Sequence, residues 1–195
     1  MSSSLQEKPL NIDGNINQGV SIGLALTSNP DVVGVELCEE NVRFSLRIFD
    51  GEAFNNFGDL DFPRNIGGSV LTDSGKVFCL GPDEWMIIDD VSKKNQYDEL
   101  IKTASGTLSC SIVDISHRNI GLRVSGPQVE AFLNGSCPLD LSLKSFPVGK
   151  CTRTVFANAE IILCRQKEFE FYVECWRSFA PYIVALMEKT IVELV

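Results

Sequence analysis

The sequence is poor in the residues and spacings that build most catalytic and cofactor sites. It holds one histidine, His117, so a Ser-His-Asp or Cys-His mechanism would have to use that residue. Its seven cysteines include no Cys-x-x-Cys pair, the close spacing on which most zinc sites depend. Gly121 and Gly126 have phosphate-loop spacing, but Pro-Gln follows in place of Lys-Ser or Lys-Thr, and no Gly-x-Gly-x-x-Gly occurs. We therefore expect no metal, nucleotide or dinucleotide site in this chain.

Positive charge and long apolar runs are also scarce. Lysines and arginines number 17 against 26 aspartates and glutamates, a net charge of -9, which argues against a nucleic-acid partner. No stretch approaches the roughly 18 uninterrupted apolar residues that span a bilayer. The segment Met1 to Leu10 lacks the basic start and apolar run of a secretory signal. Because several cysteines sit singly in apolar runs, they fit reduced core thiols, and we expect a cytoplasmic protein.

The hydrophobic content of 44% is enough for a buried core, and the first half of the chain predicts strands followed by a helix. Residues 1–30, rich in Ser, Asn and Gly, predict a flexible N-terminal arm. Short β-favouring runs at residues 32–37 and 42–49 predict a hairpin or a close strand pair, and residues 50–68 predict a loop. Strands are expected at residues 76–80 and 84–88, joined by a Gly-Pro turn, with a helix capped by Ser92 after them.

The second half follows a similar plan. Strands are expected at residues 111–115 and 120–124, then a short helix from Pro127 to Gly135. A hairpin at residues 151–156 and 160–164 and a last strand at residues 169–176 come next. The closing helix is expected to be capped by Ser178. Its apolar residues are expected to share one face of the helix: Phe179, Ile183, Met187, Ile191 and Val195.

The order strand, turn, strand, helix occurs at residues 77–104 and again at residues 160–195, a weak internal duplication. Hairpin-length links between strands favour antiparallel pairing. The predicted fold class is α+β, with two small units of mainly antiparallel sheet and helices on one face. The predicted division is a flexible arm at residues 1–30, an N-terminal unit at 31–108 and a C-terminal unit at 109–195.

Polar residues that could form a site have plain structural explanations beside the functional ones. Residues 116–119 predict a polar turn between strands in which Asp114 or Asp140 pairs with Arg118, and the rival interpretation is a stand-alone hydrolase that uses His117. Two carboxylate pairs, at residues 39–40 and 89–90, are expected in solvated turns, where their pKa values would not suit acid–base catalysis. Arg177 and Tyr182 flank a helix start that predicts either a protein-binding hot spot or simple packing on the sheet.

Several motifs occur together in one order. They are Asp114-Ile-Ser-His-Arg-Asn-Ile-Gly-Leu-Arg-Val-Ser-Gly-Pro127, Cys137-Pro-Leu-Asp-Leu141, Phe146-Pro-Val-Gly149, Arg177-Ser-Phe-Ala-Pro-Tyr182 and, earlier, Leu80-Gly-Pro-Asp-Glu-Trp85. Over about residues 70–185 the sequence resembles the gamma subunit of heterotetrameric sarcosine oxidase, and the first motif is similar to folate-binding aminomethyltransferase-type domains. The acidic folate ligand of those domains aligns to no position here, so Asp114 receives no folate-binding role.

The resemblance implies a subunit of a complex that oxidises sarcosine to glycine, releases hydrogen peroxide and passes the one-carbon unit to tetrahydrofolate. It also implies that FAD, FMN, NAD and tetrahydrofolate bind to the alpha and beta subunits, that zinc binds to the delta subunit, and that this chain carries no cofactor. We therefore expect an accessory, non-catalytic subunit of an oxidoreductase that docks on the large subunits. The rival interpretation is a free-standing folate-binding protein similar to aminomethyltransferases.

Docking requires contact residues, and the sequence supplies candidates in three places. They come from the polar turn, the loop after the short helix and the start of the closing helix: His117, Arg118, Cys137, Pro138, Leu139, Asp140, Arg177 and Tyr182.

Overall fold

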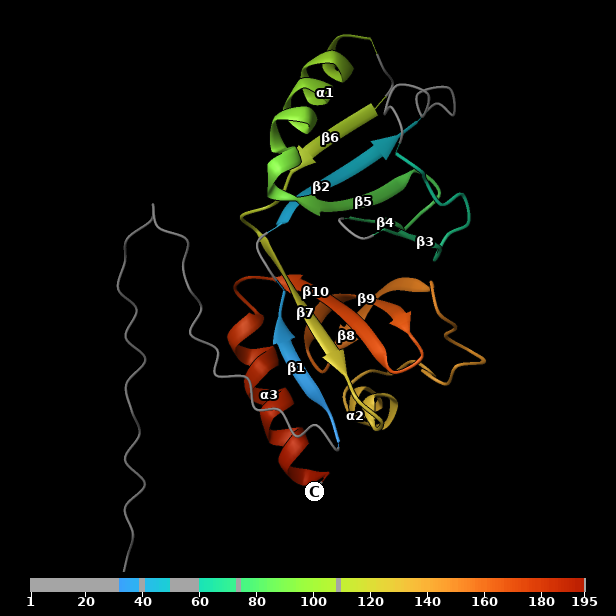
Figure 1. Cartoon of the computed structure of the whole chain (residues 1–195), viewed down its shortest axis with the longest axis vertical. Helices are drawn as coiled ribbons and strands as arrows, with labels where there is room; N and C mark the ends of the chain where they lie inside the picture. The colour runs from blue at the N-terminus through green and yellow to red at the C-terminus, as the bar shows by residue number, and fades with distance from the viewer. Residues whose placement is uncertain (1–31, 39–40, 50–59, 73–74, 108–109, 195) are drawn as a thin grey trace, which may run out of the picture.

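The computed structural model describes residues 32–38, 41–49, 60–72, 75–107 and 110–194. These residues form strands and helices that stack in layers (Figure 1). The strands are β1 (Gly34–Leu37), β2 (Asn41–Ile48), β3 (Ser69–Leu71), β4 (Lys76–Cys79), β5 (Glu84–Asp90), β6 (Cys110–Asp114), β7 (Asn119–Ser125), β8 (Cys151–Phe156), β9 (Ala159–Lys167) and β10 (Glu170–Trp176). The helices are the 3₁₀ turn η2 (Val91–Lys93), α1 (Lys94–Thr107), α2 (Val129–Asn134) and α3 (Ala180–Glu193).

Within the described residues the strands form two five-stranded sheets in which every pairing is antiparallel. The first sheet has the order β3-β4-β5-β2-β6, and the second has the order β8-β9-β10-β7-β1. The two orders correspond strand for strand, and a helix follows the third strand of each meander, α1 after β5 and α3 after β10. This correspondence extends the strand, turn, strand, helix repeat expected from the sequence.

The two halves exchange their first strands. β1 precedes β2 in the chain but pairs with β7 in the second sheet, whereas β6 precedes β7 but pairs with β2 in the first sheet. Both crossings are short: Cys38 N–H donates to the carbonyl of Gly121 at 2.9 Å, and Ile115 N–H donates to that of Arg43 at 2.8 Å. The division between sheets therefore does not coincide with the predicted boundary at residues 108 and 109.

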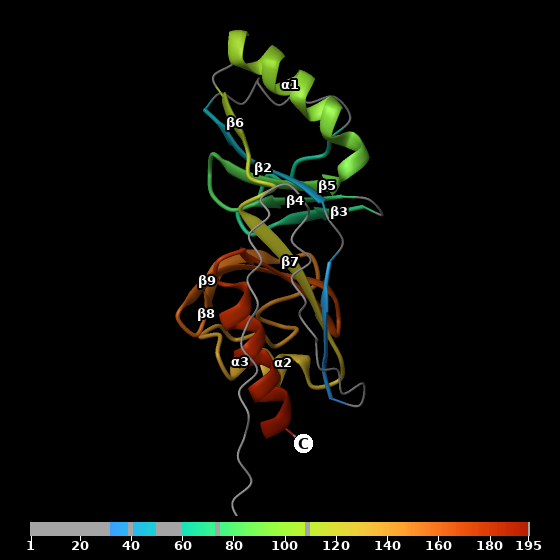
Figure 2. The ribbon, with the colours of Figure 1, turned by 90° about the vertical axis from the view of Figure 1, so that its left-hand side faces the viewer.

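The outer face of each sheet is covered by helices (Figure 2). Alternate side chains of β2, β4 and β5 pack with Tyr97, Leu100 and Ile101 of α1, as the period of 2 in a strand requires. On the second sheet, β7, β9 and β10 pack against α2 and α3, which bury Phe132, Leu133, Ile183 and Met187. The predicted α+β class, with antiparallel sheets and helices on one face of each, is confirmed.

The inner faces of the sheets meet each other. Their contact layer is a buried cluster with side chains from both sheets: Phe78, Met86, Ile88, Ile115, Cys151, Ile162, Cys164 and Tyr172. The four layers are therefore α1, the first sheet, the second sheet, and the pair α2 and α3 (Figure 1). Any polar group on the inner face of a sheet must find its partner in this contact layer or at its rim.

Some local predictions were wrong. The runs at residues 32–37 and 42–49 correspond to β1 and β2, but these strands lie in different sheets and do not pair as a hairpin. Ser92 does not cap α1, because the turn η2 comes first and Asp90 accepts the N–H of Ser92 at 2.8 Å. Ser178 does not cap α3 either: its N-cap position is Phe179, which makes no side-chain capping bond. The predicted arm at residues 1–30 lies outside the described residues.

Candidate functional site

The candidate site lies where the two chain crossings approach each other. The turn from Ile115 to Arg118 links β6 to β7, and its Ser116 hydroxyl accepts the backbone N–H of Arg43 at 2.9 Å. The end of β10 lies beside this turn, because Trp176 is the register partner of Asn119. Two of the three regions nominated by the sequence, the polar turn and the start of α3, are therefore brought together.

A polar network is buried beneath this region. Arg43 of the first sheet and Glu174 of the second form an ion pair of 2.7 Å, and the Tyr172 hydroxyl donates to the other carboxylate oxygen of Glu174. Burial raises the pKa of Glu174, and the attraction of Arg43 opposes that rise. Asn119, only 3% exposed, also lowers the pKa of Glu174. The network thus connects both sheets to the surface turn.

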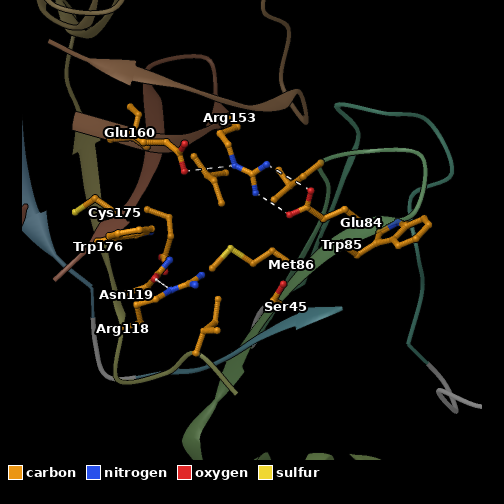
Figure 3. A pocket seen from close by; sticks show the side chains of 15 residues that line it. Ser45, Glu84, Trp85, Met86, Arg118, Asn119, Arg153, Glu160, Cys175 and Trp176 are labelled. Atoms are coloured by element: carbon orange, nitrogen blue, oxygen red, sulfur yellow. Dashed lines mark hydrogen bonds and ion pairs between the residues drawn. The ribbon is translucent and has the colours of Figure 1, made fainter. Parts of the chain in front are cut away.

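A small cleft opens above the network (Figure 3). Its volume is about 50 Å³, and its lining includes Met86, Ile115, Arg118 and Trp176. Across the cleft, Arg153 of β8 donates to Glu84 of β5 at 2.7 Å and lies 3.6 Å from Glu160. Hydrogen bonding to Arg153 lowers the pKa of Glu84, and burial opposes this shift. These ion pairs add a second connection between the sheets.

Two aromatic rings and two arginine side chains lie near the rim of the cleft; Arg118 is exposed and Arg177 is half-buried. Trp176 is 44% and Phe179 39% exposed, with ring centroids 6.1 Å apart. The Arg118 guanidinium lies 5.5 Å from the centre of the Trp176 ring, and its Nε donates to Asn119 Oδ1 at 3.0 Å. Arg177 Nε donates to the backbone carbonyl of His117 at 3.3 Å. Phe179 was expected on the buried face of α3, but it lies before the first helical residue and stays at the surface.

The expected partners of Arg118 were wrong. Asp114 instead bonds Lys94 at 2.6 Å and the Ser116 hydroxyl at 2.5 Å. Burial of Asp114 opposes its ionisation, but these hydrogen bonds outweigh it and bring the pKa to about 2. Asp140 accepts from the backbone N–H of Ser142 and the hydroxyl of Ser145. Both aspartates therefore stabilise turns.

One of the two carboxylate pairs also differs from expectation. Asp89 is not solvated: it is 2% exposed and accepts from Tyr97 at 2.9 Å and Lys93 at 3.0 Å. Asp90 is exposed and caps η2. The other predicted pair, residues 39–40, lies outside the described residues.

The remaining nominated residues lie apart from the cleft or at its edge. Cys137 is buried, and its Sγ lies 3.8 Å from the Thr154 hydroxyl, while Pro138 and Asp140 are exposed and Leu139 is half-buried. Tyr182 is 42% exposed on α3. His117 is exposed, and its ring makes no hydrogen bond to another described residue. Whether these residues contact a partner stays a prediction.

The thiols are buried in most cases. Burial raises the pKa of Cys151 and Cys175 to about 12 and that of Cys164 to about 11, which keeps these groups protonated. All seven cysteines are free, and all lie in described ranges. Within those ranges no group of His, Cys, Asp or Glu side chains is placed to hold a metal ion. No helix in the described part of the chain is both long and apolar enough to cross a membrane.

Sequence reasoning missed Arg43, Asn119, Glu174 and Trp176. A signal was present in the last strand, where Phe171, Val173 and Cys175 alternate with Tyr172, Glu174 and Trp176. Alternate residues of a strand share a face, so Glu174 lies on the same face as Tyr172 and Trp176, between these two aromatic residues. A carboxylate in that position indicates a buried charge with a partner, although the pattern does not identify the partner.

The architecture of antiparallel sheets packed face to face, with helices outside, defines a fold that this chain shares with a solved aminomethyltransferase. The aminomethyltransferase T of the glycine cleavage system from Bartonella henselae superimposes with a TM-score of 0.60 at 15% identity, over 80% of this chain and 45% of that one. The similarity is one of fold.

The sequence makes the assignment more specific. Residues 58–193 match the model of the sarcosine oxidase, gamma subunit family, and the chain belongs to that family. The sarcosine oxidase subunit gamma of Corynebacterium sp. (strain P-1) is 30% identical over 125 residues, which span 63% of this chain and 60% of the relative. A chain of the heterotetrameric sarcosine oxidase from Corynebacterium sp. U-96, in complex with pyrrole 2-carboxylate, has a TM-score of 0.78 at 23% identity, over 86% of this chain and 88% of that one.

Proposed function

We propose that this chain is the non-catalytic gamma subunit of a cytoplasmic heterotetrameric sarcosine oxidase, which it stabilises by docking on the large subunits. The observation that carries the proposal is the family match over residues 58–193. The similarity in fold to one chain of a heterotetrameric enzyme, over most of both chains, supports it. In this role the protein acts through shape and surface chemistry.

The reaction itself is assigned to the partners. The complex would oxidise sarcosine to glycine, release hydrogen peroxide and transfer the one-carbon unit to tetrahydrofolate. FAD, FMN, NAD and tetrahydrofolate would bind to the alpha and beta subunits, and zinc to the delta subunit. The cleft between the sheets supports this division, because its volume of about 50 Å³ is well below the roughly 300–1,000 Å³ of typical small-molecule sites.

Co-expression with the large subunits from the same organism tests the proposal. With the full chain present, we expect a complex that contains flavin, forms hydrogen peroxide when sarcosine is added, and has a higher melting temperature than the same preparation without the chain. The isolated chain should be colourless. Flavin absorbance in the isolated chain, or equal stability of the partners without it, would contradict the proposal.

The fold also favours one second candidate, a free-standing folate-binding protein similar to aminomethyltransferases. Against it, the chain covers 45% of the length of the aminomethyltransferase that it superimposes on. Calorimetric titration of the pure chain with tetrahydrofolate separates the two. Binding in the micromolar range by the chain alone would favour the second candidate.

A further inference from the structure

We propose that Arg118, Trp176, Arg177 and Phe179 form the docking site for one segment of a large subunit, a segment that carries a carboxylate beside an apolar side chain. We call these residues the Arg–Trp surface. The inference rests on the proposed function and makes it more specific, because it names a contact surface and the chemistry of the segment that would bind there.

The aromatic part of the surface has the composition of a binding hot spot. Trp176 and Phe179 leave 44% and 39% of their surface in water and lie close to each other at the junction of β10 and α3. Tryptophan and arginine dominate the residues that contribute most to protein–protein affinity. A partner side chain placed on the two rings would remove their exposed area from water.

The charged part of the surface lacks counter-ions. Arg43, Arg47, Arg123, Arg153 and Arg165 each have a carboxylate within 4 Å, whereas neither Arg118 nor Arg177 has one among the described residues. Each of the latter two uses its Nε for a contact within the chain, to Asn119 and to the His117 carbonyl. Their terminal nitrogens can bind a carboxylate in the bidentate manner of arginine.

The surface is also held in place before binding. Arg118 lies between the Trp176 ring and Asn119, and Asn119 is itself buried, with 3% of its surface exposed. Ordering a long side chain on binding costs free energy, so a side chain that is already ordered loses less conformational entropy when the partner binds. The cleft continues the surface inward, since Arg118 and Trp176 line it together with Met86 and Ile115 (Figure 3). A small apolar side chain of the partner can enter there.

Photo-cross-linking in the assembled complex tests the location and the partner chemistry together. A photoreactive phenylalanine analogue replaces Phe179, and in a matched control it replaces Phe169, which is 50% exposed before the opposite end of β10. We expect a cross-link from position 179 to a large-subunit peptide that contains Asp or Glu next to an apolar residue, with little cross-linking from position 169. A cross-link to residues 1–31 of this chain, to a second copy of it, or to a peptide without a carboxylate would overturn the inference.

Two substitutions test the contribution of the surface to binding. Arg118→Glu and Trp176→Ser should each weaken capture of the large subunits by roughly tenfold or more, as loss of a hot spot does. Arg123→Glu, at the other end of β7, and Phe169→Ser are the controls and should change capture less than threefold. Melting curves of the free variants show whether a substitution unfolds the protein. If it does, the cross-linking result tests the docking site in place of the capture measurement.

The outcomes separate the two proposals. If the unsubstituted chain captures no large subunit, the proposed function fails and the docking site with it. If the unsubstituted chain captures the large subunits and the Arg118 and Trp176 variants do so equally well, only the docking site is refuted. Equal losses from the control substitutions would also refute it, because the effect would then not be specific to this surface.

Discussion

Arg43 and Glu174 join the two sheets through an ion pair of 2.7 Å, with side chains that are 5% and 0% exposed. Arg43 lies on β2 of the first sheet and Glu174 on β10 of the second, each next to the strand, β6 or β7, that precedes or follows the surface turn. The pair is therefore a buried polar connection between the sheets, beside the apolar cluster that forms the contact layer.

Removing one partner of this pair should destabilise the protein strongly. Glu174→Ala leaves the Arg43 charge buried without compensation, and we expect a loss of about 3–5 kcal/mol in the free energy of unfolding, measured by urea denaturation. The double variant Arg43→Met with Glu174→Leu should recover most of that loss, because an apolar pair needs no desolvation of charge. Glu36→Gln, at the exposed pair with Arg123, is the control and should cost about 0–1 kcal/mol. A loss at Glu174 as small as that of the control would contradict the prediction.

Gly121 should resist replacement because of what lies above it. A Cβ atom at this position would lie 2.2 Å from the Tyr172 hydroxyl and 2.6 Å from its ring. Gly121→Ala should therefore cost about 1–3 kcal/mol through overpacking. In the double variant with Tyr172→Ala the total loss should be smaller than the sum of the two single losses, which urea denaturation of all four proteins can measure. Gly81→Ala, where the nearest atom lies 3.4 Å away, is the control.

Arg165 should stabilise the loop that follows α2. Its fully buried guanidinium donates to Glu130 at 2.7 Å, to the carbonyl of Glu168 at 2.7 Å and to that of Leu141, and it lies 4.5 Å from the centre of the Phe171 ring. Arg165→Ala should cost about 2–4 kcal/mol, and Arg165→Lys should recover little because it lacks the fork of donors. Faster proteolysis between residues 135 and 149 is the readout. Arg153→Ala, whose side chain is 40% exposed, should leave that rate unchanged.

The Asp114 carboxylate should make stability depend on pH in the acid range. Its pKa falls from an ordinary 3.8 to about 2 in the folded protein. Because the folded value is the lower one, the stabilisation is complete above about pH 4 and disappears as the pH falls through about 2. Asp114→Asn should thus be less stable than the unsubstituted protein at pH 7, and the gap should close at pH 2. In a Lys94→Met background the gap at pH 7 should be smaller. A gap of constant size from pH 7 to pH 2 would refute this account.

Local features of the fold could be predicted from the sequence. The hairpin at β8 and β9, the paired strands β4 and β5 and the short helix α2 all depend on turns and on alternation within a few residues. The motifs that indicate the family are likewise contiguous stretches of sequence. These features were predictable because the residues that determine them lie next to one another in the chain.

Long-range features could not be predicted in this way. β1 pairs with β7, and the paired residues Glu36 and Arg123 are 87 positions apart in the sequence. Nothing in the sequence of either strand specifies the other as its partner. Phe179 has the spacing of the α3 face, yet it is exposed because the helix starts one residue later. Arg118 has two aspartates nearby in the sequence motifs, but a ring and an amide bind it in the fold. The site was therefore only partly predictable.

The exchange of first strands means that neither half of the polypeptide can complete its own sheet. A protease cut between Thr107 and Cys110 would produce two fragments, and the first described strand of each, β1 or β6, belongs to the sheet of the other. A fragment alone would leave β2 or β7 as an uncovered edge, which favours aggregation. Reassembly would require both fragments in equal amounts, because each supplies an edge strand to the other. For the same reason, a hybrid built from halves of two relatives has to match at both strand pairs, β1 with β7 and β6 with β2.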